Sequence, residues 1–328
     1  MTTSNAGQES IIARLIRWLG AALAGLAWIV ITGWLVGGIV SDRFLWSQFL
    51  LWIPTPVTIV FVALGLMASF RPGSTKKRRR RRQLVWGGIL IAIAFVFLFV
   101  ENRFHRMGTP ERNGLRVLHW TMSHARRPRD AHIEKVEELI GDVSFLSEAY
   151  GLNWPEAMSR LLGPEGKMAR AGRYWILSTI DIIEARTIIS RDGVEISLVQ
   201  LDTTEQLGRV LIVYLIDLPS APTIGRAAQA RSVRLLLDGM SIPRADMIVG
   251  DFNTPRGSRS LSILFPDMHH AYDDSGRGYG ASFHRVFPLY HIDHILLTAD
   301  LQATSYELVN PGIGRHDVQV ATILPVSR

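Results

Sequence analysis

The sequence predicts a protein in two parts, an anchor of three transmembrane helices followed by an α+β domain of two packed sheets. Two observations support this fold class. Beyond about residue 113, short strand-like runs outnumber amphipathic helices. In the first 100 of the 328 residues there are three uncharged apolar stretches, at about 18–41, 44–70 and 83–100. We therefore expect a membrane anchor over residues 1–105 and an outer domain over residues 113–328.

The three apolar stretches have the length that a bilayer requires. A transmembrane helix needs roughly 20 mainly apolar residues, with about 17 as a lower limit. The first two stretches exceed this length and the third just reaches it. Pro54 and Pro56 predict a kink in the second helix without excluding it. Three such stretches so close together argue against the buried helices of a soluble core, and further spans after the first argue against a cleaved signal peptide.

The positions of Lys and Arg predict the orientation of the anchor. Arg14 and Arg17 precede the first stretch, whereas only Asp42 and Arg43 separate it from the second. A strongly basic loop, residues 71–82, separates the second stretch from the third. Loops rich in Lys and Arg stay in the cytoplasm. The sequence therefore predicts a multi-pass protein of the cell membrane with a cytoplasmic N-terminus and an extracytoplasmic C-terminal domain.

Composition narrows the classes of function. The net charge is +7, and much of it comes from the run Lys76 to Arg82. Such a run can bind nucleic acid, but between two membrane helices it is better interpreted as a topology determinant that contacts anionic lipid. The chain contains no cysteine, which excludes disulfides and thiol chemistry.

The outer domain is predicted from short patterned segments. Apolar runs rich in β-branched residues indicate strands, and apolar residues three and four positions apart indicate helices. In chain order we expect a strand at "LRVLHW", a helix at "DAHIEKVEELIGD", a strand at "VSFLSEAYG", a short helix at "NWPEAMSRLLG", a hairpin at "ARTIISRDGVEISLVQL" that turns at Asp192-Gly193, a strand at "GRVLIVYLIDLP", a helix at "RAAQARSVRLLLDGM", a strand at "DMIVGDFN", a short helix at "SRSLSILF", and closing strands at "YHIDHILLT", "TSYELVN" and "VQVATIL". This mixture of hairpins and crossovers predicts largely antiparallel sheets with helices outside.

Polar side chains stand at the ends of several predicted strands. In "MIVGDFNTP", Asp251 and Asn253 are expected on the same side because strand side chains alternate. Other residues share this position at a strand end: Thr121, Glu148, Asp217, Asp293 and His316. Taken singly, each is more often a turn or capping residue. Together, the carboxylates, amide and imidazole form an oxygen-rich set that suits Mg²⁺ or Mn²⁺.

The order and spacing of these segments resemble a known superfamily. The motifs "LRVLHWTM", "DVSFLSEAYG", "RAAQ", "IVGDFNTP", "GRGYGASF", "HIDHIL" and "GRHDVQVATI" are similar to those of the endonuclease/exonuclease/phosphatase superfamily, which has the DNase I-like fold. The resemblance covers about residues 115–324, and the short N-terminal spans look like those of membrane-anchored bacterial members. It implies a four-layer α/β/β/α sandwich of DNase I-like type.

The resemblance also implies roles for individual residues. Glu148 matches the principal metal-binding carboxylate. Asp251 matches the residue that aligns or deprotonates the attacking water, and we expect it to bind the metal as well. Asn253 matches the phosphate-orienting neighbour, and His316 matches the catalytic histidine. Asp293 matches the carboxylate that fixes the tautomer and orientation of that histidine.

Three possible auxiliary positions depart from the superfamily pattern. Thr121 stands where the superfamily usually has Asn, and Asp217 stands where it usually has His. Arg315, in "GRH", stands where it usually has Asp. An arginine beside a cation site repels the metal, although it can instead clamp a phosphate oxygen.

The resemblance and the residues together predict a membrane-anchored phosphoesterase that depends on Mg²⁺ or Mn²⁺. Outside the cytoplasm, phosphorylated lipid is the expected substrate, with another phosphoester or a pyrophosphate as a further choice. One alternative is a degenerate member that binds phosphorylated ligands without turnover. Another is an extracytoplasmic nuclease, although nucleic acid is the less favoured partner. Protein partners are left open by the sequence.

Overall fold

The chain folds into two units, residues 1–101 and residues 102–328. The computed structural model describes residues 11–71, 75–106, 114–122, 130–149 and 154–326. Within these ranges, the first unit is helical and the second contains the strands. The expected start of the outer domain, residue 113, lies outside the described residues.

Two helices of the first unit are long and apolar enough to cross a membrane. The first is α1 (Ile11–Val40), and the second runs over Lys76–Glu101. The second consists of α4 (Lys76–Phe95) and a π-helical end (Val96–Glu101). Both agree with predicted spans in position, although each begins several residues earlier than expected.

The second predicted span consists of two helices, so its prediction as a single helix needs correction, whereas the kink predicted at its prolines is present. The chain forms α2 (Leu45–Leu51) and α3 (Thr55–Ala68), which are bent by 68° at the break between them. Pro54 is the N-cap of α3 and has no backbone N–H to continue the hydrogen-bond ladder of α2. The described residues therefore contain two candidate spans, or three if the bent pair counts as one.

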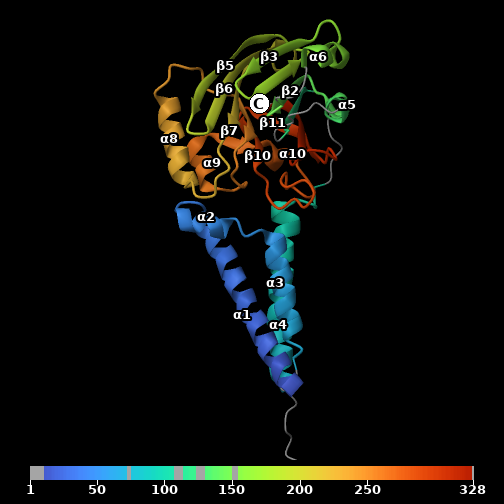
Figure 1. The fold of residues 1–328 in the computed structure, drawn as a ribbon, viewed down its shortest axis with the longest axis vertical. Coiled ribbons are helices and arrows are strands. Elements are labelled where there is room, and N and C mark those ends of the chain that lie inside the picture. Colours follow the sequence, from blue (N-terminus) through green and yellow to red (C-terminus); the bar gives the residue numbers. More distant parts are fainter. Residues whose placement is uncertain (1–10, 72–74, 107–113, 123–129, 150–153, 327–328) are drawn as a thin grey trace, which may run out of the picture. The chain divides into compact units, whose positions relative to one another are not determined.

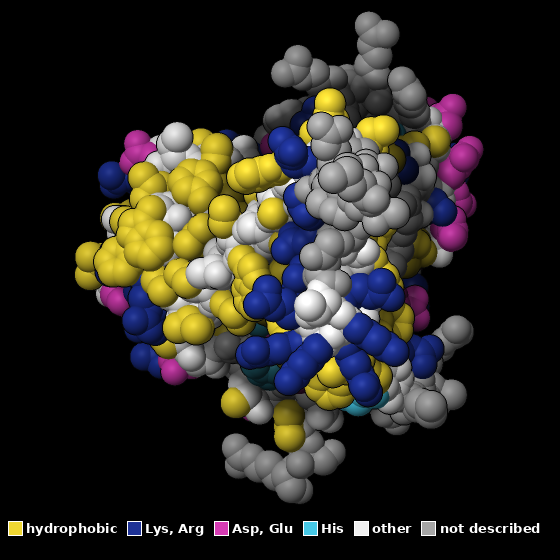
Figure 2. Space-filling model, turned by 90° about the horizontal axis from the view of Figure 1, so that it is seen from below, with side chains coloured by type: hydrophobic (Ala, Val, Ile, Leu, Met, Phe, Trp, Pro, Cys, Tyr) yellow, Lys and Arg dark blue, Asp and Glu magenta, His cyan; other side chains and the backbone are white. Residues whose placement is uncertain are grey.

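The basic run also differs from its prediction. Residues 76–82 are helical and form the start of α4, with the hydroxyl of Thr75 accepting a hydrogen bond from the Arg78 N–H. Lys and Arg are good helix formers, and the run contains neither Pro nor Gly to end a helix. Residues 76–81 are exposed, and Lys and Arg side chains gather on the face seen in Figure 2.

The second unit contains two six-stranded sheets. The strand order of the first sheet is β11–β12–β1–β2–β4–β3. Among the described strands of this sheet, β1 and β2 are parallel and the other neighbours are antiparallel. Its strands are β1 (Leu115–Thr121), β2 (Val143–Ser147), β3 (Lys167–Ala171), β4 (Tyr174–Ser178), β11 (Leu301–Val309) and β12 (Val318–Pro325).

The second sheet has the order β5–β6–β7–β8–β10–β9. Here β7 and β8 are parallel and the remaining neighbours are antiparallel. Its strands are β5 (Ile182–Arg191), β6 (Val194–Thr203), β7 (Arg209–Asp217), β8 (Met247–Asp251), β9 (Met268–His270) and β10 (Asp293–Thr298). Each sheet thus contains one parallel pair, so the prediction of largely antiparallel sheets is confirmed.

The two sheets pack face to face around the main core. Phe145 of the first sheet and Val213 of the second belong to the same buried cluster. Burial of apolar area at roughly 25 cal/mol per Å² makes this interior the main stabilising contact between the sheets. The two sheets with helices outside them (Figure 1) fit the α/β sandwich of DNase I-like type that the resemblance implies.

Helices cover the outer faces of both sheets (Figure 1). On the second sheet, Val233 and Leu264 belong to one cluster with the strand side chains. On the first sheet, Val136 packs in the same way. The helices are α5 (Asp130–Leu139) and α6 (Trp154–Leu162) on the first sheet, α8 (Arg226–Asp238) and α9 (Arg259–Leu264) on the second, and the short α7 (Thr204–Leu207) and α10 (Ala271–Ser275) between strands.

The patterned segments predicted most of these elements. The β5–β6 hairpin turns at Asp192-Gly193 with positive φ at both residues, as expected for a two-residue turn. The three closing strands are present as β10, β11 and β12. The sequence analysis missed the β3–β4 hairpin and the short β9. The hairpin segment carries Lys167, Arg170 and Arg173, which obscure the apolar alternation.

Candidate active site

Three aspartates lie side by side at one edge of the second sheet. Asp251 ends β8 and pairs in register with Asp217, the last residue of the parallel strand β7. On its other side, Asp251 pairs with Asp293, the first residue of the antiparallel strand β10. All three are buried. Buried carboxylates are costly unless positive or hydrogen-bonding groups compensate them, so the neighbours of each determine what this edge can do.

Asp293 is the best compensated of the three. Its Oδ2 lies 2.8 Å from Nδ1 of His316 and accepts a 2.7 Å hydrogen bond from the hydroxyl of Ser282. Its Oδ1 accepts a 2.9 Å hydrogen bond from the hydroxyl of Thr121. The far nitrogen of His316, Nε2, lies 4.0 Å from Oδ2 of Asp251, beyond hydrogen-bond distance. The imidazole is therefore held by Asp293 on one side and presented toward Asp251 on the other.

The pair of His316 and Asp293 is an ion pair at neutral pH. Burial lowers the pKa of His316, but the charge and hydrogen bond of Asp293 outweigh burial and raise this pKa to about 9. Burial raises the pKa of Asp293, but His316 again outweighs burial and the pKa falls to about 2. A protonated imidazole beside an ionised carboxylate stabilises negative charge that develops next to it.

Asp251 has less support. Its Oδ1 accepts a 2.8 Å hydrogen bond from the backbone N–H of Asn253. Burial, followed by the charge of Asp293, raises the pKa of Asp251 well above its ordinary range. Asn253 lies beyond the end of β8 with φ of +47°, and its amide donates a 2.7 Å hydrogen bond to the Leu218 carbonyl. Asn253 thus ties the loop after β7 to the end of β8.

Gly250 allows the neighbouring strands to approach this edge closely. It has φ of +154°, and a Cβ built there would lie 1.9 Å from the Ile216 carbonyl oxygen and 2.7 Å from the Tyr174 hydroxyl. That hydroxyl donates a 2.6 Å hydrogen bond to the same carbonyl. No side chain fits at position 250 without displacing β7, so the residue before Asp251 must be glycine.

Glu148 follows directly after β2 and adopts a left-handed conformation with φ of +54°. Its backbone N–H donates a 3.2 Å hydrogen bond to the Arg173 carbonyl. The side chain is half-buried, and its negative charge contributes to raising the pKa of both Asp217 and His316. Glu148 therefore lies close enough to act electrostatically on the aspartate edge from the other sheet.

Arg173 is a site residue that the sequence analysis did not find. Its Nη1 lies 2.6 Å from Oδ2 of Asp217, and its Nε lies 3.5 Å from Oε2 of Glu195. Burial raises the pKa of Asp217 to about 6, although Arg173 lowers it in part. Arg173 lies in the turn of the missed β3–β4 hairpin, 44 positions from Asp217. The only available signal was an arginine in the turn "AGRYW", which is too common to indicate a site.

The auxiliary positions have different surroundings. The Thr121 hydroxyl binds Asp293 directly, and Asp217 binds Arg173. The side chain of Arg315 is exposed, and its backbone carbonyl accepts a 2.7 Å hydrogen bond from the Arg285 N–H. Thr121 and Asp217 therefore belong to the cluster, whereas no contact described here places the Arg315 side chain in it.

A buried polar layer fixes the cluster from behind. The side-chain amide of Gln319 donates a 2.7 Å hydrogen bond to the Asp293 backbone carbonyl. Its oxygen lies 2.8 Å from Nδ1 of His119, and the amide also donates to the Tyr306 hydroxyl. Burial lowers the pKa of His119 and keeps it neutral. These contacts orient β10 and β12, which carry Asp293 and the residues after His316.

The donor set of this edge fits a hard metal ion. Asp251, Asp293 and His316 each carry one atom of a type that binds metals, and these atoms lie within 4.8 Å of one another. While Asp293 holds His316 protonated, the carboxylates are the donors of this set. Burial raises the pKa of Asp251, and the charges of Asp293 and Asp217 add to this, while His316 lowers it in part. Carboxylate oxygens are the ligands that Mg²⁺ and Mn²⁺ prefer, so a divalent cation at this edge would stabilise the ionised form of these carboxylates.

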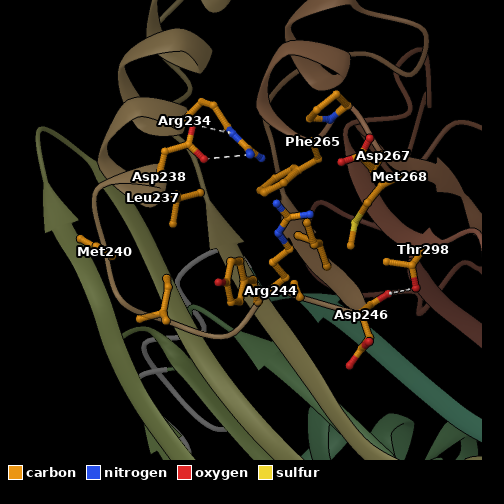
Figure 3. Close-up of a pocket in the computed structure, with 15 residues that line it drawn as sticks. Arg234, Leu237, Asp238, Met240, Arg244, Asp246, Phe265, Asp267, Met268 and Thr298 are labelled. Carbon is orange, nitrogen blue, oxygen red and sulfur yellow. Dashed lines mark hydrogen bonds and ion pairs between the residues drawn. The ribbon is translucent and has the colours of Figure 1, made fainter.

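A separate pocket lies at the opposite end of β8. It has a volume of about 360 Å³ and is lined by residues before and at the start of the strand, including Arg244 and Asp246. Figure 3 shows the ion pair of Arg234 with Asp238 on one side of it. Asp251 is at the other end of the same strand, so this pocket is not part of the aspartate edge.

No protein-family model and no curated protein matches this chain. Solved structures do match. An endonuclease/exonuclease/phosphatase family protein from Bacteroides thetaiotaomicron is 13% identical with a TM-score of 0.49, covering 67% of this chain and 98% of that chain. A mannosyl-6-phosphatase from the same organism is 13% identical with a TM-score of 0.48, covering 64% and 99%. A 3′-5′ exonuclease from Neisseria meningitidis is 12% identical with a TM-score of 0.47, covering 63% and 98%. The similar structures thus include a phosphatase, a nuclease and a protein of the superfamily that the motifs resemble.

Proposed function

We propose that the chain is a membrane-anchored, metal-dependent phosphoesterase whose catalytic domain lies outside the cytoplasm. The observation that carries this proposal is the arrangement of Asp251, Asp293 and His316. The charged imidazole of His316 is held by the buried carboxylate of Asp293 and faces Asp251, whose pKa is raised. A proton acceptor and a stabiliser of negative charge side by side are what the attack of water on a phosphate ester requires.

Each residue has a distinct part in this reaction. Asp251 accepts the proton of the attacking water, and its raised pKa makes it a stronger base than an ordinary aspartate. Protonated His316 donates a hydrogen bond to a phosphoryl oxygen as negative charge develops there. Asp293 keeps the imidazole charged and oriented, and Thr121 and Ser282 fix Asp293. As the new P–O bond forms, the bond to the leaving oxygen breaks and that oxygen takes up a proton from solvent water, to which Asp251 then releases the proton it accepted.

Glu148 and Asp251 are the proposed metal ligands. A divalent cation bound there supplies charge stabilisation for the phosphoryl oxygens. Mg²⁺ usually takes only one or two protein carboxylates and retains several waters. Two carboxylates from different sheets are therefore sufficient for this role.

The test is phosphate release by the full-length protein in detergent, with Mg²⁺ or Mn²⁺ and with a chelator. We expect release that the chelator abolishes. Asp293→Asn and His316→Ala should each lower turnover by roughly 10²- to 10⁴-fold. Their double variant should be little worse than the worse single variant, because the two residues act as a unit. Asp238→Asn, in an exposed ion pair with Arg234, is the matched control and should retain activity.

A second candidate function is a binding protein that does not cut. Arg173 forms an ion pair with Asp217. A threonine stands at position 121, where the superfamily usually has Asn. Both features reduce the ligands left for a cation. Saturable binding of phosphorylated lipid by the parent, without phosphate release under either metal, would favour this candidate. Cleavage of DNA oligonucleotides in preference to lipid and sugar phosphates would favour a nuclease instead.

A further inference from the structure

A short loop beside His316 presents two large apolar side chains to solvent. Val286 is 69% exposed and Phe287 is 71% exposed. The backbone of the loop is closed by hydrogen bonds, with the Phe287 N–H donating to the His284 carbonyl at 2.8 Å and the Tyr290 N–H donating to the Phe283 carbonyl at 2.9 Å. The turn is therefore ordered and holds both side chains outward. Single exposed apolar residues are common, but an ordered pair at a loop tip calls for a partner.

The exposed pair is part of a larger aromatic surface. The Tyr279 hydroxyl donates a hydrogen bond to the Pro288 carbonyl, and Tyr279 is 38% exposed. The ring of Phe104, which is 51% exposed, lies over Gly278. We call the three aromatic side chains Phe104, Tyr279 and Phe287, together with the aliphatic Val286, the aromatic tip.

Basic side chains lie beside the aromatic tip. Arg285 is next to Val286 in the loop, and its Nε donates a 3.0 Å hydrogen bond to the Gly314 carbonyl. Its backbone N–H donates to the carbonyl of Arg315, which is exposed. Arg277 is exposed two positions before Tyr279. Apolar and aromatic side chains next to Arg are typical of surfaces that enter the headgroup region of a bilayer containing anionic lipid.

Chain connectivity favours a bilayer over a protein partner. The apolar helix over Lys76–Glu101 is directly followed in the sequence by Asn102. Asn102 is buried, and its side-chain oxygen accepts a 2.8 Å hydrogen bond from the Gly280 N–H. Arg103 then pairs with Asp273 at 2.7 Å. The residues that directly follow the apolar helix in the sequence are thus fixed to the loop that carries Tyr279. The aromatic tip therefore lies in the same part of the domain as these residues.

The same loop connects the aromatic tip to the catalytic pair. Phe283 forms a β-bridge with His316, and their ring centroids lie 4.8 Å apart. The preceding residue, Ser282, donates its hydroxyl to Asp293. From this juxtaposition we infer that the aromatic tip inserts into the bilayer surface and holds the aspartate edge at the headgroup level. The substrate class is then phosphate esters carried on membrane lipids, an inference that rests on the proposed function.

Position is tested first, because it does not depend on catalysis. The chain has no cysteine, so Phe287→Cys gives one labelling site for a nitroxide in the full-length protein reconstituted in liposomes with anionic lipid. Leu235→Cys, 72% exposed on α8, is the matched control. We expect the label at 287 to be accessible to oxygen dissolved in the bilayer and shielded from a water-soluble nickel complex, and the label at 235 to show the reverse. Equal exposure to water at both positions would overturn the inference. So would shielding at 287 that also appears in lipid-free detergent and rises with protein concentration, because it would indicate contact between copies.

Activity gives the second test. The variant with Val286→Ser and Phe287→Ser should hydrolyse a long-chain lipid phosphate in liposomes about tenfold more slowly than the parent. It should hydrolyse a short-chain, water-soluble phosphate ester at the parental rate, and Leu235→Ser should match the parent on both. An equal loss on both substrates would assign the loop to folding or catalysis and overturn the anchoring role. If the parent hydrolyses neither substrate, the proposed function fails, while the label positions still decide whether the tip enters the bilayer.

Discussion

Nδ1 of His316 and Oδ2 of Asp293 lie 2.8 Å apart, although the two residues are 23 positions apart in the chain. This contact joins the start of β10 to a residue two positions before β12, and it therefore depends on the two sheets packing correctly. Because both groups are buried, their charges depend on each other. The protonation state of His316 is consequently a direct report on the integrity of the candidate site.

The first prediction concerns the titration of His316. In metal-free protein we expect its NMR signals to titrate near the pKa of about 9, and in Asp293→Asn nearer to the ordinary value of 6.5 or below it, because burial then dominates. A raised folded-state pKa stabilises the protein fully below 6.5, and this contribution is lost as the pH rises through about 9. Asp293→Asn should therefore be most destabilising near pH 6 and progressively less so as the pH rises from 6.5 through about 9. An unshifted titration in the variant would contradict the ion pair.

The second prediction concerns Glu148. Glu148→Gln keeps the size of the side chain and removes its charge, so the metal concentration needed for half-maximal activity should rise by roughly tenfold or more. The fold should be unchanged in circular dichroism. Glu138→Gln, on the exposed surface of α5, is the control and should titrate like the parent. The same metal requirement in Glu148→Gln and the parent would remove Glu148 from the set of ligands.

The third prediction concerns Arg173, which supports Asp217. Arg173→Gln should raise the pKa of Asp217 above about 6. At pH 5 this carboxyl is largely protonated in both proteins, whereas at pH 8 the variant must bury an unpaired charge. The variant should therefore lose more thermal stability at pH 8 than at pH 5. The loss should be modest, about 1 kcal/mol, because a third of the guanidinium is exposed. Arg186→Gln, in an exposed pair with Glu184, should show no such pH dependence. An equal loss at both pH values would mean that Arg173 does not compensate Asp217.

The fourth prediction concerns topology. A reporter enzyme that works only outside the cytoplasm should be active when fused after Arg328. The same reporter should be silent when fused to a chain that ends at Arg82, because basic residues stay inside. The reverse pattern would place the aspartate edge in the cytoplasm and make intracellular nucleic acid a substrate to test.

The sequence was most informative where the structure of a residue is determined by its neighbours in the chain. Asp251 was recognisable because an apolar strand ends at it, and the β5–β6 turn because Asp192-Gly193 suits positive φ. Asp293 and His316 could be paired only through the resemblance, since their contact depends on distant strands. The two corrections, at Pro54 and at the basic run, are also local. A proline ends a hydrogen-bond ladder even in an apolar stretch, and a run of Lys and Arg can be helical as readily as a loop.

Arg173 and Asn253 show why the rest of the site could not be predicted from the sequence. An ion pair between residues 173 and 217 leaves no trace in either local pattern. The alternation rule assumed that the strand continues to Asn253, but β8 ends at Asp251 and Asn253 turns back to the Leu218 carbonyl. Tertiary hydrogen bonds decide where such a strand stops, and they cannot be read from one segment.

In the motif "GDFN", which begins at Gly250, the glycine and the aspartate are constrained for different reasons. The neighbouring strand and the Tyr174 hydroxyl demand the glycine whether or not the chain performs chemistry. Under the proposed function, the aspartate that follows is required for the reaction. Among chains with this fold, the glycine is therefore expected to survive the loss of catalysis, whereas the aspartate is free to drift. A sequence that keeps the glycine and has lost the aspartate would be a folded descendant without activity. A search for active members should therefore score each position of the motif separately.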